Sequence, residues 1–192
     1  MKKRTVFLSA ILSLIPLGQP LFFKTGFVLS TTGLMLYVSQ NVYARDYSYY
    51  FDSGVDKAKN GDYYGAVYAF TKAIEINPSA SAYYNRGWTK QKLEDFYGAV
   101  ADYTKAIEMN PKYEDAYINR GISKRKLKDY YGAISDYQKV IELNPTDMQP
   151  YLYSSIAKEF IGDIPGACVD AKKAISLGDQ DPKNKIWIES NC

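Results

Sequence analysis

The sequence predicts an all-α fold, a helix-turn-helix solenoid of about four units, because one short pattern returns at a nearly fixed interval. In this pattern an aspartate is separated by two residues from a Gly-Ala pair, and the alanines of the four pairs stand at positions 66, 99, 133 and 167. Asn-Pro pairs beginning at positions 77, 110 and 144 keep the same rhythm. A period of about 34 residues holds two helices and two turns. Stacked units share one core and present an extended concave surface.

The unit that starts at Ala80 illustrates how each repeat is expected to fold. A first helix runs over Ala80–Leu93, and a second runs over Tyr97–Met109 after a turn. Small residues such as Gly87 and Ala99 lie where two helix backbones come close. Pro111 ends the second helix because proline lacks a backbone donor and disfavours helix in the residue before it.

Composition and charge point to one ordered domain behind a basic leader. The 192 residues are 46% hydrophobic and 23% charged. Residues 1–45 hold five of the 24 basic residues and no acidic one, which leaves 19 basic against 21 acidic residues, a net charge of −2, for the remainder. Nucleic-acid binding requires a concentrated basic face. We therefore expect no nucleic acid partner.

The residue types argue against an enzyme, a cofactor site and a metal site. The chain has no histidine and only two cysteines, which removes the usual general base near neutral pH and most zinc sites. No Gly-Lys pair of a phosphate-binding loop is present. The acidic residues of the repeated pattern are expected to be solvated or to cap helices: Asp62, Asp95, Asp129 and Asp163.

Residues 1–44 are expected to be a signal peptide or a membrane anchor. Met1-Lys-Lys-Arg4 precedes an apolar stretch over Thr5–Phe23, the apolar character resumes over Phe27–Val42, and Val42-Tyr43-Ala44 resembles a cleavage site. Cleavage after Ala44, a single anchor and a hairpin of two crossings remain alternatives, with a buried core helix as the least favoured. We favour export of the repeats to a periplasm, a thylakoid lumen or the extracellular space. If the leader is retained as an anchor, the repeats are expected on the non-cytoplasmic side of the membrane.

The repeated residues resemble the tetratricopeptide repeat (TPR), whose pattern is a large residue, Gly, Ala, an aromatic, Ala and Pro. The first unit supplies these residues as Tyr50, Gly54, Ala66, Phe70, Ala73 and Pro78. The second supplies Tyr83, Gly87, Ala99, Tyr103, Ala106 and Pro111, and the third supplies Tyr117, Gly121, Ala133, Tyr137, Val140 and Pro145. The fourth is degenerate, with Tyr151, Ser155, Ala167, Ala171 and Ala174. The resemblance covers about 135 of the 192 residues.

The resemblance implies repeats at 47–79, 80–113, 114–147 and 148–181. Because a terminal repeat needs a cap, residues 182–192 are expected to form a capping helix. It also implies that first helices line a concave groove that binds a protein or peptide, with aromatic anchors beside amides. The predicted groove residues are Phe51, Tyr84, Asn85, Trp88, Gln91, Ile118, Asn119, Arg125, Leu152 and Tyr153.

One lysine recurs late in each first helix. The family usually has an aromatic residue where this chain has Lys57, Lys90, Lys124 and Lys158. Their aliphatic stems are expected to cover apolar surface while the ammonium groups reach water.

Some family members bind the C-terminal carboxylate of heat-shock chaperones through a clamp of Lys, Asn and Arg residues. In this chain the clamp positions hold other residues, namely Phe51, Val55 and Asp115. We expect no binding of such tails.

The two cysteines are expected to form a disulfide. If residues 182–191 fold back as an antiparallel helix, Cys168 and Cys192 come level and close a 25-residue loop. The tail resembles that of exported bacterial, notably cyanobacterial, TPR proteins that end in cysteine. A disulfide implies an oxidising compartment. Two unpaired thiols remain the alternative.

The preferred hypothesis is a non-enzymatic interaction scaffold that holds a protein or peptide, and assembly of an envelope or membrane complex is one such role. The alternative is a self-associating structural organiser tethered to the membrane. The sequence leaves the oligomeric state open.

Overall fold

The computed structural model describes residues 21–22, 28–29 and 46–192, and the chain forms two compact units, Met1–Asp46 and Tyr47–Cys192. In the first unit β1 (Leu21–Phe22) pairs antiparallel with β2 (Val28–Leu29). The predictions made for residues 1–44 otherwise fall outside the described residues. Among the helices that can be described, none is both long and apolar enough to cross a membrane.

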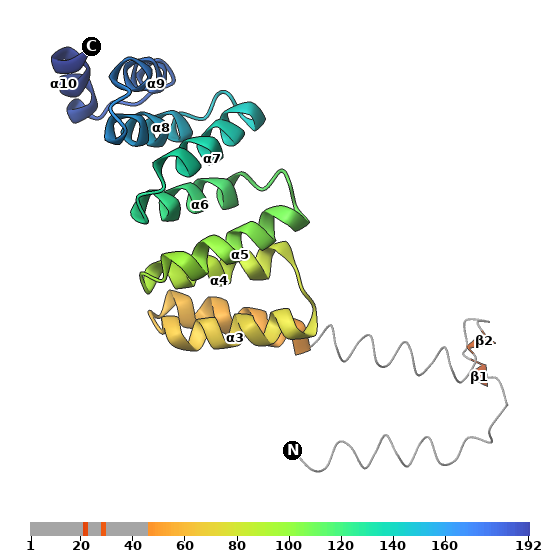
Figure 1. Cartoon of the computed structure of the whole chain (residues 1–192). Coiled ribbons are helices and arrows are strands. Elements are labelled where there is room, and N and C mark those ends of the chain that lie inside the picture. Colours follow the sequence, from red (N-terminus) through yellow and green to blue (C-terminus); the bar gives the residue numbers. More distant parts are fainter. Residues whose placement is uncertain (1–20, 23–27, 30–45) are drawn as a thin grey trace. The chain divides into compact units, whose positions relative to one another are not determined.

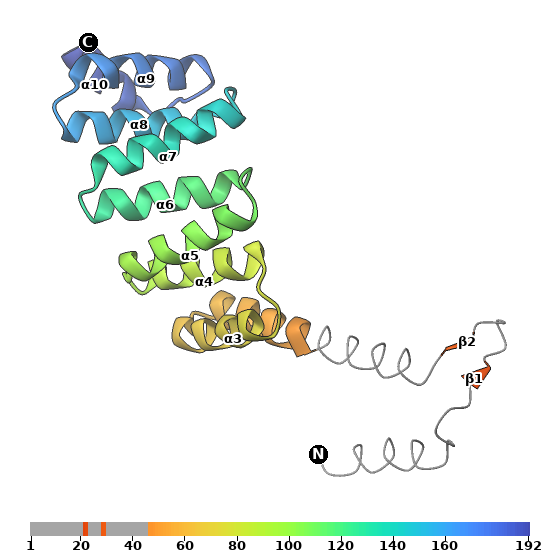
Figure 2. The ribbon, with the colours of Figure 1, turned by 45° about the vertical axis from the view of Figure 1, so that its right-hand side comes forward.

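Residues 46–192 form a helical solenoid, so the predicted fold class is confirmed for this unit, and the two short strands lie outside it (Figure 1). Each helix packs on the next along the chain, as Figure 2 shows from a second direction. The first helices are residues 46–59, α4 (Ala80–Lys92), α6 (Glu114–Lys126) and α8 (Gln149–Phe160). The second helices are α3 (Tyr63–Ile76), α5 (Phe96–Met109), α7 (Tyr130–Leu143) and α9 (Ile164–Ser176), and α10 (Pro182–Asn191) follows.

The repeated acidic residue caps each second helix, as the sequence predicts. The Asp95 carboxylate accepts a hydrogen bond from the backbone N–H of Gly98 at 2.9 Å, and Asp62, Asp129 and Asp163 do the same for the other second helices. An acceptor at this position satisfies an N–H that has no partner inside the helix. A side chain at Gly98 would overlap the Asp95 carboxylate, which explains why glycine precedes the repeated alanine.

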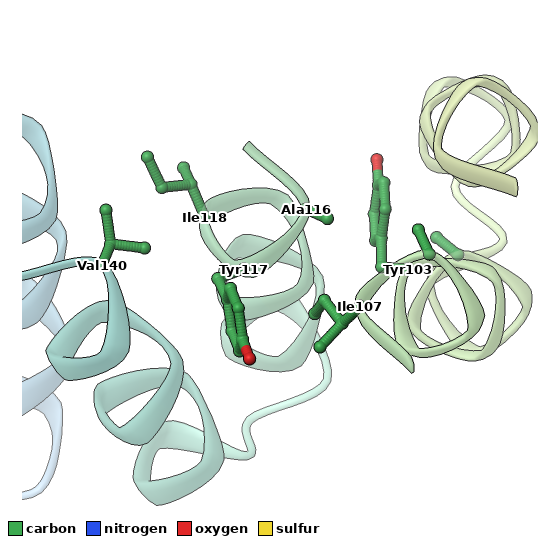
Figure 3. Close-up of a cluster of buried hydrophobic side chains, with 8 residues drawn as sticks. Tyr103, Ile107, Ala116, Tyr117, Ile118 and Val140 are labelled. Atoms are coloured by element: carbon green, nitrogen blue, oxygen red, sulfur yellow. The ribbon is translucent and has the colours of Figure 1, made fainter. Parts of the chain in front are cut away.

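The core of each of the first three repeats is built around a glycine facing an aromatic ring. Gly54 faces Phe70, Gly87 faces Tyr103, and a Cβ atom added to Gly121 would lie 2.6 Å from the Tyr137 ring. All three aromatic residues are fully buried. Figure 3 shows how the buried residues of neighbouring helices continue this packing from one repeat to the next, including Tyr103, Ala116, Tyr117, Ile118 and Val140.

The fourth repeat departs from this pattern at two positions that compensate for one another. Ser155 stands where the other repeats have glycine, and Ala171 stands where they have the aromatic ring. Both residues are buried. Because alanine leaves the space that a ring would fill, a larger residue fits opposite it. The repeat that looks degenerate in sequence therefore keeps the same pair of helices.

Replacing Gly121 by alanine is expected to lower the free energy of unfolding by about 1–3 kcal/mol, because the new methyl group would force the Tyr137 ring from its place. Urea unfolding followed by circular dichroism measures this change. Ser155→Ala is the matched control, since the fourth repeat has Ala171 in place of the aromatic residue, and it should cost less than about 1 kcal/mol. Equal losses in the two variants would refute this account of the glycine.

Candidate partner-binding face

The first helices lie side by side and form one continuous surface, here called the first-helix face. Helix α4 contacts α6, and α6 contacts α8, in addition to the contacts each makes with its own second helix. A hydrogen bond of 3.1 Å from Asn119 Nδ2 on α6 to the Tyr84 hydroxyl on α4 joins two of these helices directly. Residues of successive repeats can therefore act together on one ligand.

Tyr84 lies at the centre of an aromatic cluster on this face. Its ring stacks on Tyr113 with centroids 4.9 Å apart, and it lies 5.7 Å from the ring of the buried Tyr103. Desolvation raises the pKa of the Tyr84 phenol to about 12, and the nearby Asp115 carboxylate adds to the effect. Tyr84 therefore stays neutral well above physiological pH, and its hydroxyl accepts the hydrogen bond from Asn119.

The raised pKa of Tyr84 predicts a loss of stability in alkali. Between pH 10 and 12 the phenol ionises in the unfolded chain but not in the folded one, so the unfolded chain holds fewer protons and stability falls as pH rises. In Tyr84→Phe the loss of unfolding free energy between pH 10 and 12 should be smaller by up to about 2 kcal/mol. Urea midpoints measured at steps of pH test this. An unchanged slope in Tyr84→Phe would contradict the prediction.

Trp88 lies one helical turn beyond Tyr84 and is partly exposed. The edge of its ring meets Tyr63 of the preceding repeat at a centroid distance of 6.3 Å, and Lys92 Nζ lies 4.9 Å from the ring centroid. A cation over an indole face is attracted to it. Trp88 is thus fixed between two neighbours while part of its surface stays open to solvent.

The other apolar residues predicted for the face differ in their exposure. Ile118 is 8% exposed and belongs to the core between repeats, so it offers little surface to a partner. Phe51 stacks on Tyr47 and meets the ring of Phe70, and it is partly exposed. Leu152 and Tyr153 are also partly exposed.

Three of the predicted polar residues, Asn85, Asn119 and Gln91, are held by hydrogen bonds within the chain. The Asn85 and Asn119 side chains each donate to the backbone carbonyl four residues earlier, at 2.8 and 2.9 Å. Gln91 Oε1 accepts a hydrogen bond of 3.1 Å from the Tyr103 hydroxyl. Arg125, at the position equivalent to Gln91, lies near Tyr137. Desolvation raises the pKa of the Tyr137 phenol, and the charge of Arg125 offsets only part of this rise. The hydrogen bonds fix Asn85, Asn119 and Gln91 in advance of any binding, whereas the buried Nε of Arg125 has no hydrogen-bond partner.

Buried ion pairs join the two helices of a repeat, and the expectation that the lysines reach water is wrong for three of them. Asp102, on α5, is 3% exposed and receives Arg86 Nε and Nη2 at 2.9 and 2.6 Å. Lys90 Nζ lies 2.8 Å from the same carboxylate. A buried charge needs such partners because desolvation is costly. Lys57 instead meets the exposed Asp62.

The third repeat contains the same cluster, and the fourth contains part of it. Asp136 is bound by Arg120 and Lys124, as in the second repeat. In the fourth repeat Lys158 Nζ lies 2.7 Å from Asp170, although this approach is not aligned for a hydrogen bond. Ser154 replaces the arginine there, and its hydroxyl is buried without a hydrogen-bond partner. The sequence contained a signal for these buried ion pairs, because Asp102, Asp136 and Asp170 recur at the repeat period.

The structure joins Cys168 of α9 to Cys192 through a disulfide, as predicted, with Cα atoms 5.7 Å apart. Helix α10 packs on α9 at the end of the array. The Trp187 indole on α10 donates a hydrogen bond of 3.0 Å to Glu159 on α8. Helix α10 therefore contacts both helices of the fourth repeat.

Other candidate sites in the described residues are few. Among residues 21–22, 28–29 and 46–192, no cluster of His, Cys, Asp or Glu is arranged to hold a metal ion. An open hollow of about 360 Å³ lies between α6 and α7, where Tyr117, Arg120 and Asp136 are among its lining residues. Because Asp136 is already paired with Arg120, this hollow offers no free buried charge to a ligand.

Comparison with known proteins agrees with the repeat pattern. The family model described as tetratricopeptide repeat matches residues 80–113 and 114–147. The chain is similar to the crystal structure of MamA, with 25% identity, a TM-score of 0.68 and coverage of 71% of this chain and 81% of that one. No curated protein matches the chain.

Two further solved structures share the fold and have ligands named in their descriptions. YrrB, described as a TPR protein with an unusual peptide-binding site, has 18% identity and a TM-score of 0.67, and the match covers 83% of this chain and 89% of that one. The first TPR domain of Spaghetti (RPAP3), bound to the HSP90 peptide SRMEEVD, has 24% identity and a TM-score of 0.59, with coverage of 62% and 94%. The family-model match and the shared architecture show that this chain contains tetratricopeptide repeats.

Proposed function

We propose that this protein is a non-enzymatic scaffold that binds a segment of another protein on its first-helix face, as part of an envelope or membrane complex. The observation that carries the proposal is Trp88, a partly exposed aromatic residue held by Tyr63 and Lys92 beside the Tyr84 cluster. Rigid aromatic anchors flanked by polar groups are typical of binding hot spots. Related folds with peptide ligands support a peptide-like partner.

The chemistry of the face favours an extended segment with apolar side chains. Trp88, Leu152 and Tyr153 offer partly exposed apolar surface along successive repeats. Both hydrogens of the Asn119 amide are used within the chain, so its Oδ1 remains to accept a hydrogen bond. A backbone N–H of the partner fits this acceptor. Val55, Phe51 and Asp115, in place of basic or amide residues, continue to argue against binding of a chaperone tail.

We further propose that the repeats act in an oxidising compartment outside the cytoplasm. The Cys168–Cys192 disulfide supports this location, because such bonds persist where thiols are not kept reduced. The basic and apolar leader supports export or membrane attachment. Mass spectrometry of protein from its native host, before and after reduction, tests the bond, and an unchanged mass would contradict the proposed compartment.

Photocrosslinking in the native host tests the proposed function. A photoreactive phenylalanine analogue at Trp88 should capture one partner chain, whereas the analogue at Tyr64, which is 80% exposed on the second helix of the first repeat, should not. Mass spectrometry identifies the captured chain. If the analogue at position 88 captures nothing while the analogue at position 64 does, the first-helix face is not the binding site.

Self-association is the second candidate, and exposed tyrosines on the second helices favour it. Tyr64, Tyr97 and Tyr131 occupy equivalent positions in three repeats and are 80%, 77% and 74% exposed. Repeated exposed apolar surface often marks an interface. Light scattering over a range of concentrations separates the candidates, since a concentration-independent monomer excludes a self-associating organiser.

A further inference from the structure

Arg125 on α6 and Tyr137 on α7 lie near one another, and each has a buried donor without an acceptor. Tyr137 is fully buried, and no residue in the described part of the chain forms a hydrogen bond with its hydroxyl. The buried Nε of Arg125 is also without such a partner. Because a guanidinium only donates hydrogen bonds, Arg125 cannot accept the proton of the tyrosine hydroxyl.

The second repeat contains the acceptor that the third repeat lacks. Tyr103 is equivalent to Tyr137, and its hydroxyl donates a hydrogen bond of 3.1 Å to Oε1 of Gln91. Gln91 occupies the position that Arg125 takes in the third repeat. A donor with a positive charge has therefore replaced an internal acceptor at this one position of the first-helix face.

Arg125 also differs from the other arginines of α4 and α6 because it has no carboxylate. Arg86 pairs with Asp102, and Arg120 pairs with Asp136, each at 2.6 Å. Within residues 46–192, Arg125 forms no ion pair. Partial burial of a charge without a counter-charge is costly. A carboxylate from another molecule offsets this cost, because it accepts charge-assisted hydrogen bonds from a guanidinium.

The guanidinium of Arg125 can be reached from the first-helix face. Arg125 is partly exposed, and Nε is the only one of its nitrogens that is buried without a partner. Ile122 precedes Arg125 by three residues, so the two lie on the same side of α6. Ile122 packs against the same buried cluster as Trp88 of α4. Arg125 and Trp88 therefore belong to neighbouring first helices and can contact one bound segment.

We propose that Arg125 binds the carboxylate of an acidic side chain in the partner segment, beside the apolar side chain bound at Trp88. The inference rests on the proposed function, because it names the charge that the same bound segment carries. The face continues beyond α6 to Leu152 and Tyr153 of α8, so the carboxylate belongs to a residue within the segment. Arg125 lies about 15 Å along α6 from Asp115, which stands at a position of the chaperone clamp, so the two sites differ.

Arg125→Gln removes the charge while restoring the arrangement of the second repeat. Glutamine at this position should accept a hydrogen bond from Tyr137, as Gln91 does from Tyr103. The urea midpoint should therefore equal or exceed that of the wild type, which keeps a loss of binding separate from a loss of folding. A lower midpoint would show that Arg125 stabilises the free protein, and it would overturn this account of the unpaired donors.

Photocrosslinking from Trp88 in the native host measures the effect on binding. Arg125→Gln should reduce capture by the analogue at position 88 at least about tenfold. The matched control is Lys126→Gln, which removes the same charge from an exposed neighbour and should reduce capture less than about twofold. Unchanged capture in Arg125→Gln, or equal losses in both variants, overturns this inference alone. No capture at 88 in the otherwise unchanged chain overturns the proposed function.

Charge exchange identifies the carboxylate on the captured chain. Mass spectrometry locates the crosslinked segment, and each Asp or Glu within it is replaced by Arg in turn. Arg125→Glu alone should abolish capture at 88, and one of these partner substitutions should restore it. If no substitution restores capture, or if the segment has no acidic residue, the ligand of Arg125 is not an acidic side chain and the inference is wrong.

Discussion

Replacing Asp102 by alanine is expected to lower the free energy of unfolding by about 3–5 kcal/mol, because Arg86 and Lys90 would remain buried without a counter-charge. The side chains of Arg86 and Lys90 are only 16% and 21% exposed. Urea unfolding at neutral pH, followed by circular dichroism, measures the loss. The change should appear as a lower midpoint with little change in the slope of the transition.

Glu108→Ala is the matched control for Asp102→Ala on the same helix. Glu108 pairs with Lys105 at 2.7 Å, but both side chains are more than half exposed, and exposed pairs contribute less than about 1 kcal/mol. Replacing Arg86, Lys90 and Asp102 together by apolar residues of similar size should recover much of the stability. A loss in Asp102→Ala no greater than that in Glu108→Ala would show that the buried cluster is not a source of stability.

Removing the disulfide is expected to destabilise the C-terminal end of the array by about 3 kcal/mol, because the bond restricts a loop of about 25 residues in the unfolded chain. Cys168→Ser/Cys192→Ser is the variant to compare with the oxidised protein. Hydrogen exchange resolves the effect by region, since repeat arrays can open from their ends. Protection should fall first in α9 and α10.

Reduction provides an internal control for this second prediction. Dithiothreitol should bring the wild-type protein to the stability of the double serine variant and leave that variant unchanged. A reductant effect of the same size in the variant would mean that the loss does not come from the Cys168–Cys192 bond. Unchanged protection of α9 in both proteins would mean that packing, rather than the bond, holds this end of the array.

The architecture could be predicted from the sequence because it depends on contacts that recur at one spacing. The repeated acidic residue and glycine cap a helix locally, as Asp95 and Gly98 show. Gly87 and Tyr103 meet within one repeat, so their spacing predicts the contact. The Cys168–Cys192 bond was predictable on the assumption that the tail folds back as a helix, because the helix lengths then bring the two residues level.

The candidate face was less predictable because exposure depends on several helices at once. Ile118 and Leu152 occupy equivalent positions, yet Ile118 is buried and Leu152 is partly exposed. Lys90 was expected to reach water, but a carboxylate on the facing helix holds it. A helical pattern tells which residues share one face of a helix, but it does not tell what the neighbouring helix places against them.

The sequence by itself determined the helical solenoid, the caps of its second helices and the pairing of its cysteines, because each depends on a fixed separation along the chain. Only the tertiary structure decided which charges are buried and which aromatic residues stay open. In the folded chain Asp102 pairs with Arg86 and Lys90 away from solvent. Trp88 stays partly exposed to solvent, and Ile186 stays exposed. The physical reason is that burial of a side chain depends on the sum of its surroundings, and those surroundings come from residues of several repeats.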